Sequence, residues 1–215
     1  MPKPGSHLCV VRNFVTTLDG VVSLHAKGHA GADISGFSVQ DRMVMGLLRA
    51  TADGVIVGSG TLSADPTHVW TPEAVCPQLA DAYRRLRTSL GLRAAPLNVI
   101  VSGNGRVDLG LPVFASGKVP ALIVTTISGA KRLRKQRVPD SLEIRVIHRR
   151  SRAIPARAIL DEMCRVSSAQ RILIEGGPRL LGDFYAERLI DEQLLTLAPQ
   201  IAGRDVGDGR PSHRQ

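Results

Sequence analysis

Short, almost wholly apolar runs of strand length recur along the chain, and segments with helical periodicity separate several of them. A strand that is apolar on both faces belongs in a parallel sheet covered on both sides by helices. The expected strands cover residues 8–15, 54–58, 97–101, 121–126, 142–147, 171–174 and 193–197. The expected helices cover residues 38–50, 80–90, 155–166 and 178–189. The sequence therefore predicts an α/β fold with a mostly parallel central sheet and helices on both faces.

Capping residues mark the beginnings of the expected helices. Ser38 precedes the first helix and Asp41 follows three residues later, which is an acidic form of the capping box. Pro155 and Pro178 stand in the first turn of two others, where a missing N–H costs no hydrogen bond. No linker rich in Gly and Ser divides the chain. We therefore expect one domain over residues 1–203 and a polar, flexible tail over residues 204–215.

The chain is basic, with a formal net charge of +9 and a pI of about 10.3. Much of the excess positive charge lies in residues 131–137 and 148–152. Such runs bind nucleic-acid phosphates in some proteins, and form solvated faces or attract small anions in others. Aromatic residues make up 3% of the chain and none interleaves with these runs, so the stacking surface of single-strand binders is missing. We expect a small-molecule partner rather than nucleic acid.

The sequence also bears on location and metal content. No apolar run reaches the length of a bilayer span, and the first residues lack the apolar core of a secretory signal. Three cysteines, Cys9, Cys76 and Cys164, are widely spaced and odd in number, which matches neither a zinc site nor a disulfide framework. These patterns predict a cytoplasmic protein with no membrane contact and no metal.

The first candidate for chemistry is Gly58-Ser59-Gly60-Thr61, at the end of the expected strand 54–58. Glycine at such a junction lets backbone amides approach a phosphate or sugar closely, and the hydroxyl of Thr61 adds a donor. The motif resembles part of the dinucleotide fingerprint, but Ser63 replaces its third glycine and Ala64-Asp65-Pro66 argues against a helix after it. A nucleotide-binding loop and a plain tight turn both stay open on these residues alone.

The second candidate is Glu175-Gly176-Gly177-Pro178, which joins an expected strand to an expected helix. Two glycines at a helix N-terminus expose free amides and the positive end of the helix dipole, an arrangement that suits a pyrophosphate. Glu175 places a carboxylate at the carboxyl end of a strand, where α/β sheets bind ligands. A simple strand-to-helix turn does not account for that carboxylate.

Two further features lie at strand ends. Thr17 and Asp19, within Thr16-Thr17-Leu18-Asp19-Gly20, follow the first strand and are typical of substrate or cofactor contacts, although Asp-Gly is also an ordinary turn pair. Asp65 lies just past the first glycine motif, with Pro66 fixing its loop. Together with the two glycine motifs, these residues indicate one site at one edge of the sheet.

The chain resembles the pyrimidine reductases of riboflavin synthesis. The likeness rests on Thr17-Leu18-Asp19-Gly20, on Leu48-Arg49-Ala50 before the strand 54–58, on the Gly-Ser-Gly-Thr motif with Asp65-Pro66, and on residues 173–178. It continues into residues 189–192 and 197–201 and covers about residues 8–203. The Glu-Gly-Gly turn and the run from Leu189 to Pro199 are its specific parts.

The resemblance implies a dihydrofolate-reductase-like sheet, a homodimer, and NADPH as the cofactor that reduces a ribosylaminopyrimidine. The implied cofactor contacts are Gly58, Ser59, Gly60, Thr61, Glu175, Gly176, Gly177 and Pro178, with Ser102 and Thr125 along the adenosine half and Arg106 on the 2′-phosphate. The implied substrate contacts are Asn13, Thr17, Asp19, Arg49 and Glu175. Asp65 is the candidate catalytic residue, since the protein must position the reactants and handle a proton.

The chain departs from the family pattern at two places. Asn13 stands where the bacterial enzymes carry a lysine, and residues 67–70 replace a segment with an arginine. Both cations help to hold the substrate's phosphate in those enzymes. Two alternatives therefore stay open: the same fold and cofactor acting on a dihydropteridine or another imine, and a basic protein that binds nucleotides or nucleic acid without catalysis.

Overall fold

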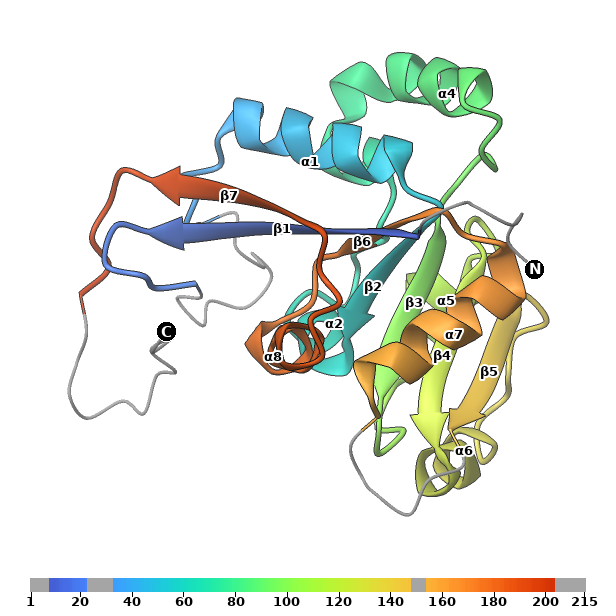
Figure 1. Ribbon diagram of the computed structural model, residues 1–215. Coiled ribbons are helices and arrows are strands. Elements are labelled where there is room, and N and C mark those ends of the chain that lie inside the picture. The colour runs from blue at the N-terminus through green and yellow to red at the C-terminus, as the bar shows by residue number, and fades with distance from the viewer. Residues whose placement is uncertain (1–7, 23–32, 148–153, 204–215) are drawn as a thin grey trace.

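The computed structural model describes residues 8–22, 33–147 and 154–203. Within these residues one sheet has the strand order β5-β4-β3-β2-β6-β1-β7, and all its neighbouring strands are parallel (Figure 1). The strands are β1 (Cys9–Thr17), β2 (Gly54–Gly58), β3 (Leu97–Ser102), β4 (Ala121–Thr126), β5 (Leu142–Ile147), β6 (Arg171–Ile174) and β7 (Glu192–Ala198). The predicted α/β fold with a parallel central sheet is confirmed.

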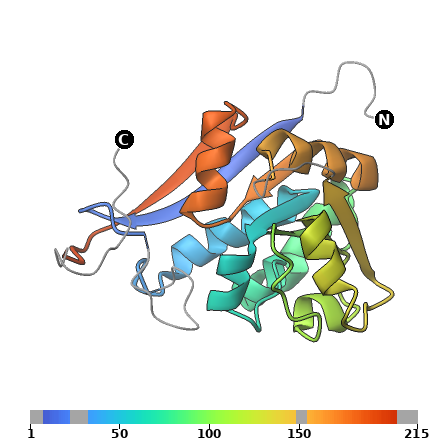
Figure 2. The same cartoon turned by 90° about the horizontal axis from the view of Figure 1, so that it is seen from below.

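Helices cover both faces of the sheet (Figures 1 and 2). They are α1 (Val39–Thr51), α2 (Ser59–Ala64), α3 (Pro72–Val75), the 3-10 helix η1 (Pro77–Leu79), α4 (Ala80–Ser89), α5 (Pro112–Ala115), α6 (Ile127–Leu133), α7 (Ala156–Ser167) and α8 (Pro178–Ala186). On one face, Met163 of α7 and Phe184 of α8 share a core with Ile56 of β2. On the other, α2, α5 and α6 pack on the alternate strand residues, as Leu62 does on Val57.

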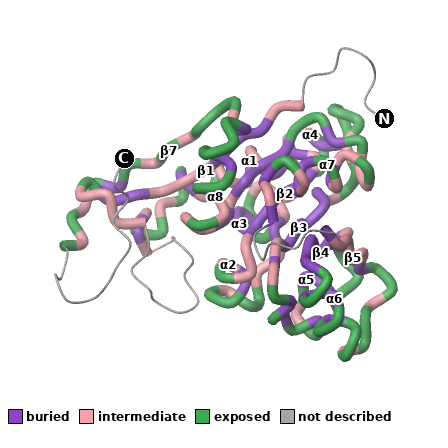
Figure 3. Tube along the Cα trace, turned by 60° about the horizontal axis from the view of Figure 1, so that its bottom comes forward, coloured by how far each residue is buried: buried purple, intermediate pink, exposed green. Residues whose placement is uncertain are grey.

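The central strands of the sheet and its edge strand β7 differ in how far their residues are buried. The central strands β2, β3 and β4 are almost wholly buried, whereas most residues of the edge strand β7 are exposed (Figure 3). Arg12 of β1 pairs with Ile174, the last residue of β6, and β1 then continues to Thr17. Five more residues of strand carry β1 about 16 Å past the end of β6. β1 and β7 therefore form an overhanging two-stranded arm, visible in Figure 1.

The helix α1 begins as the sequence predicts but presents its apolar stripe to the outside. Ser38 is the N-cap, and its side chain accepts from the amide of Asp41. Val39, Met43, Val44 and Leu47, which carry the helical periodicity, are all exposed. The buried face instead carries Gly46, Arg49 and Ala50. The period of the stripe therefore predicted the helix, while its polar residues face the protein.

Some expectations need correction. The segment after β2 is a helix, α2, and not a loop, because Pro66 ends a helix of one and a half turns instead of preventing it. Thr16 and Thr17 are inside β1, since pairing with β7 extends that strand. The short helices α3, α5 and α6 were not predicted, and the basic residues 131–137 begin within α6. The basic run 148–152 and the tail 204–215 lie outside the described residues.

Candidate active site

Two strand-to-helix junctions meet at the carboxyl ends of β2 and β6. These strands are parallel neighbours, with Ile56 opposite Ile174, so both chains leave the sheet at almost the same level. The amide of Glu175 donates to the carbonyl of Ile56 at 3.0 Å, which continues the ladder across the junction. The helices α2 and α8 each begin within four residues of this point. The two glycine motifs of the sequence are thus brought together by the strand order.

The glycines of both junctions face each other closely. A Cβ atom on Gly176 would lie 3.5 Å from the amide nitrogen of Gly58 and only 2.6 Å from Cδ2 of Leu180, and one on Gly177 would lie 3.7 Å from Oγ1 of Thr61. Gly58 and Gly177 are the N-caps of α2 and α8, and glycine has no side chain to occupy the helix amides. Gly60 lies inside α2. The two junctions, residues 58–61 and 175–178, together form a backbone cradle, with the Thr61 hydroxyl at its side.

A buried ion pair lies beside this cradle. Nη2 of Arg49 is 2.6 Å from Oε2 of Glu175, and Nε is 3.0 Å from Oε1, so the guanidinium binds the carboxylate in a fork. The two side chains are 2% and 9% exposed. Removal of one partner would leave the other as an uncompensated buried charge, which costs about 3–5 kcal/mol. Glu175 is therefore held by Arg49 of α1 at the edge of the sheet.

The end of α1 that carries Arg49 is itself fixed. The Arg87 guanidinium of α4 donates through Nη1 to the carbonyl oxygens of Arg49, Ala50 and Ala52, at 3.0, 3.2 and 2.9 Å. The amide of Ala52 donates to the carbonyl of Arg49 at 3.4 Å, and Arg87 supplies further donors to these carbonyls at the C-terminus of α1, where a helix runs out of N–H donors of its own. Arg87 thus holds the backbone from which Arg49 reaches the site.

His68 extends the ion pair toward Asp65. Its Nε2 is 3.0 Å from Nη1 of Arg49, and its Nδ1 is 3.5 Å from Oδ2 of Asp65. Burial, with a smaller contribution from the charge of Arg49, lowers the pKa of His68 to about 3. The imidazole is therefore neutral at neutral pH. A continuous row of polar groups runs from Glu175 through Arg49 and His68 to Asp65.

The loop that carries Asp65 and His68 is anchored to the core. Trp70 is buried, and Asn98 of β3 accepts from its amide at 2.9 Å and donates to its carbonyl at 3.2 Å. The carbonyl of Thr71 accepts from Nη1 of Arg49 at 3.1 Å. The Trp70 ring meets the His68 ring edge-on, with centroids 5.1 Å apart. The loop therefore has a defined position against α1 and β3.

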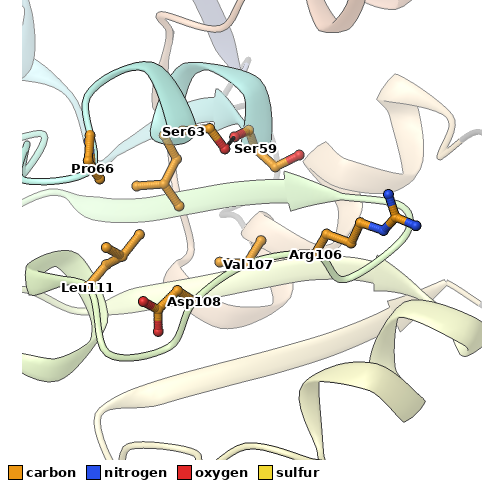
Figure 4. Close-up of a pocket in the computed structure, with 8 residues that line it drawn as sticks. Ser59, Ser63, Pro66, Arg106, Val107, Asp108 and Leu111 are labelled. Atoms are coloured by element: carbon orange, nitrogen blue, oxygen red, sulfur yellow. Dashed lines mark hydrogen bonds between the residues drawn. The ribbon is translucent and has the colours of Figure 1, made fainter. Parts of the chain in front are cut away.

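A pocket of about 300 Å³ lies between α2 and the segment after β3 (Figure 4). Ser59, Leu62, Ser63 and Pro66 line it from α2 and the following turn, and Arg106, Val107, Asp108 and Leu111 line it from the segment after β3. Asp65, although it lies between two of these residues in the chain, is not among the eight. Arg106 is exposed, and its guanidinium points away from the other residues that line the pocket (Figure 4).

Ser102 and Thr125 are both buried at the ends of β3 and β4. The Thr125 hydroxyl donates to the carbonyl of Ser102 at 2.6 Å, and the Ser102 hydroxyl is 3.4 Å from Oδ1 of Asn104. These contacts join the two strands at the point where the segment toward Arg106 begins. A direct cofactor contact by either hydroxyl stays a prediction.

Three predicted substrate contacts, two in β1 and one just after it, fall at two places. Asn13 follows Arg12 and is level with Glu175, which follows the paired residue Ile174 on β6. Thr17 lies four residues farther along the overhanging arm. The Asp19 carboxylate accepts from the Thr17 hydroxyl and from the amides of Ala202 and Gly203. These hydrogen bonds lower the pKa of Asp19, and the one from Thr17 contributes most.

His68 is the member of this site that the sequence did not reveal. One histidine in a loop carries no pattern, and the sequence marked residues 67–70 only as a departure from a family motif. Its position depends on Arg49, which is 19 residues away in the chain and on another element. Within the described residues, no group of three or more His, Cys, Asp or Glu side chains is placed to hold a metal ion. No helix of those residues combines the length and apolarity of a membrane span.

Residues 9–212 match the family model of the RibD C-terminal domain, which is nearly the whole chain. The chain belongs to this family. The resemblance seen in the sequence is therefore confirmed, and the convergent Gly58 and Gly176-Gly177 junctions are part of a RibD C-terminal domain.

Individual relatives agree with this assignment. The 2,5-diamino-6-ribosylamino-4(3H)-pyrimidinone 5′-phosphate reductase of Archaeoglobus fulgidus is 25% identical over 194 residues, which is 90% of this chain and 81% of that protein. The riboflavin biosynthesis protein RibD of Chlamydia muridarum is 28% identical over 164 residues, 76% of this chain but only 40% of that protein. The chain thus spans less than half the length of that relative. A pyrimidine reductase-like protein from Corynebacterium diphtheriae shares the fold with a TM-score of 0.70 at 21% identity, over 90% of this chain and 75% of that one.

Proposed function

We propose that this chain is an NADPH-dependent reductase that acts on a ribosylaminopyrimidine phosphate in riboflavin biosynthesis. The observation that carries the proposal is the meeting of the two glycine junctions beside the buried Arg49–Glu175 pair, in a member of the RibD C-terminal domain family. The relative from Archaeoglobus fulgidus, which the chain matches over most of both lengths, is named as a reductase of such a substrate.

The cradle fits a dinucleotide. A Cβ atom on Gly176 would clash with the Leu180 side chain, and one on Gly177 would reach to 3.7 Å from Oγ1 of Thr61, so glycine at both positions keeps the backbone amides of the junction uncovered for a pyrophosphate. Pro178 and Ser59 begin the two helices there, and Arg106 stands at the neighbouring pocket, where a guanidinium would pair with a 2′-phosphate. When bound, NADPH supplies the hydride that reduces a C=N bond of the substrate at carbon, while the nitrogen takes a proton.

The chain's own residues then position the substrate and manage that proton. Asp65 is the proposed catalytic residue, since its carboxylate lies at the free end of the polar row that starts at Glu175. The fixed Arg49–Glu175 pair gives the substrate a rigid polar wall. Asn13, level with Glu175 on the neighbouring strand, is the proposed contact for the remaining polar edge of the substrate.

The outward stripe of α1 supports a homodimer. Val39 is 67% exposed and Met43, Val44 and Leu47 are 36–47% exposed, which leaves a row of apolar side chains on one helix in water. An exposed apolar row of this kind marks an interaction surface, and we propose a second copy of this chain as its partner. A Leu47→Glu change should shift the oligomeric mass measured by light scattering toward the monomer, with Leu90→Glu, at an exposed leucine just after α4, as control.

Two measurements test the proposed function in sequence. NADPH binding is followed by fluorescence titration, and turnover is followed by the loss of NADPH absorbance with the ribosylaminopyrimidine phosphate. Binding with turnover supports the proposal. Binding without turnover would reject the substrate and retain the cofactor, and absence of binding would reject the reductase itself.

A further inference from the structure

His68 occupies a place between the ion pair and the proposed catalytic carboxylate. Its ring links a residue of α1 to the end of α2: Nε2 is 3.0 Å from Nη1 of Arg49 and Nδ1 is 3.5 Å from Oδ2 of Asp65. The side chain is 23% exposed. The charged groups around the ring are Arg49 from α1, Asp65 from the end of α2 and Glu175 from the β6–α8 junction.

The tautomer of His68 follows from its neighbour. A guanidinium has five N–H donors and no acceptor, so the atom it contacts must offer a lone pair. Nε2 of His68 is therefore unprotonated, and the single ring proton of the neutral imidazole lies on Nδ1. That proton faces Oδ2 of Asp65, while the Thr67 hydroxyl lies 3.2 Å from the other oxygen, Oδ1.

The ring is held from several sides. Arg49 cannot turn away without losing Glu175 and the carbonyl of Thr71. Trp70 packs edge-on against the imidazole and is itself fixed by Asn98. A donor that is fixed in this way can direct a carboxylate without a charge of its own.

We propose that His68, as the Nδ1–H tautomer set by Arg49, is a positioning residue that aims the Asp65 carboxylate at the substrate. The inference rests on the proposed function for the role of Asp65, but not for the tautomer. A distance of 3.5 Å is long for a hydrogen bond, and catalytic contacts of this kind tighten when substrate binds. His68 thereby couples the buried pair to the reacting group.

Two substitutions separate the two ring nitrogens. His68→Gln keeps an acceptor near the Nε2 position for Arg49 but removes the donor toward Asp65, whereas His68→Asn keeps a donor near the Nδ1 position and removes the acceptor. We expect kcat of His68→Gln to fall by about 100-fold, with KM and the Kd for NADPH within about twofold of wild type. His68→Asn should retain kcat within about fivefold of wild type, because the donor remains.

The pattern of the two variants decides the role. Equal losses in kcat would show that the ring only fills space, and equal retention would show that Asp65 needs no help from it. Either result overturns the proposal. Thermal unfolding of both variants checks that they fold. A pair that unfolds alike, with the larger loss in kcat in His68→Gln, supports the proposal, whereas a larger loss in His68→Asn overturns it.

The tautomer has a test that does not depend on activity. In ¹⁵N-labelled wild-type protein, the His68 ring should show a protonated Nδ1 and an unprotonated Nε2, and should stay neutral down to about pH 4. A protonated Nε2, or titration near pH 6.5, would overturn the proposal even in an active enzyme. If the ring has the expected tautomer but the wild-type protein reduces no substrate, the proposed function fails and the Arg49–His68 contact stands.

Discussion

Polar residues lie at the carboxyl ends of two pairs of neighbouring strands, β2 with β6 and β1 with β7, and the two pairs end differently. At β2 and β6, neighbouring strands end at the same level, and the residues that follow them meet as a cradle and an ion pair. At β1 and β7, the strands run on together as an overhanging arm, and the Asp19 carboxylate just after β1 accepts from backbone amides just after β7. The two regions carry similar residue types, namely hydroxyls, carboxylates and glycines.

From this difference we infer that polar residues at a strand end form a shared site when the neighbouring strands end at the same level. Asp19 follows a strand just as Glu175 does, but β1 extends to Thr17, and this carries both Thr17 and Asp19 well beyond β6. Asp19 there fixes the segment after β7 through the amides of Ala202 and Gly203. Glu175 instead faces a cation from a distant helix.

We expect the largest effect on activity from Asp65, which lies in the region where β2 and β6 end. Asp65→Asn removes the carboxylate with little change in size, so we expect kcat to fall by about 10²- to 10⁴-fold while NADPH still binds. Stopped-flow absorbance measures kcat, and fluorescence titration measures NADPH binding. Asp81→Asn, on the exposed face of α4, is the matched control and should behave as wild type. Full activity of Asp65→Asn would remove this residue from the site.

The next largest effect is expected on stability, from the buried Arg49–Glu175 ion pair. Arg49→Met leaves the Glu175 carboxylate buried without its cation, so urea unfolding should show a loss of about 3–5 kcal/mol in the free energy of unfolding. The double variant Arg49→Met/Glu175→Leu removes that stranded charge and should recover part of the loss. Arg84→Met breaks only the exposed pair with Asp81 and should cost little. A small effect of Arg49→Met would contradict the burial of the pair.

A smaller effect is expected at the cradle itself. A Cβ atom at position 177 would make only an ordinary contact with Thr61, so Gly177→Val should fold. Its side chain should then cover the amides that we propose bind the pyrophosphate. We expect the Kd for NADPH to rise by about tenfold or more, about 1.4 kcal/mol, with an unchanged melting temperature. Gly182→Ala in the same helix, where a Cβ would meet no described atom within 4 Å, is the control. Unchanged binding by Gly177→Val would place the cofactor elsewhere.

The arm should give the smallest effect on activity. The pKa of Asp19 is lowered by its hydrogen bonds, so its contribution to stability is present above its ordinary pKa of 3.8 and is lost as the pH falls below it. Asp19→Asn should therefore be less stable than wild type at pH 7, and the two should converge as the pH falls below the lowered pKa of Asp19. Its kcat/KM should stay close to wild type. A loss comparable to that of Asp65→Asn would make the arm part of the site.

Much of the fold could be predicted because it depends on local patterns. The apolar runs marked the strands to within about two residues at their ends, and Ser38 and Pro178 marked the beginnings of two helices. What could not be predicted depends on partners far along the chain. β1 is longer than its apolar run because β7 pairs with it, and α1 buries Arg49 instead of its apolar stripe because Glu175 is there to receive it.

The same distinction holds for the site. The Glu175-Gly176-Gly177 junction could be recognised because an anion site at a helix N-terminus is formed by residues that are adjacent in the sequence. The pairing of Arg49 with Glu175 joins residues 126 positions apart, and the role of His68 follows only from that pairing. A single sequence carries no signal for such contacts.

The central claim is that the cofactor binds where β2 and β6 end together. Amide NMR of the protein titrated with NADPH tests it most directly. We predict that the shifts concentrate at residues 58–61 and 175–178 and around Arg106, while the amides of Thr17 and Asp19 stay in place. Shifts confined to the arm, or the absence of any shift at saturating NADPH, would contradict the account.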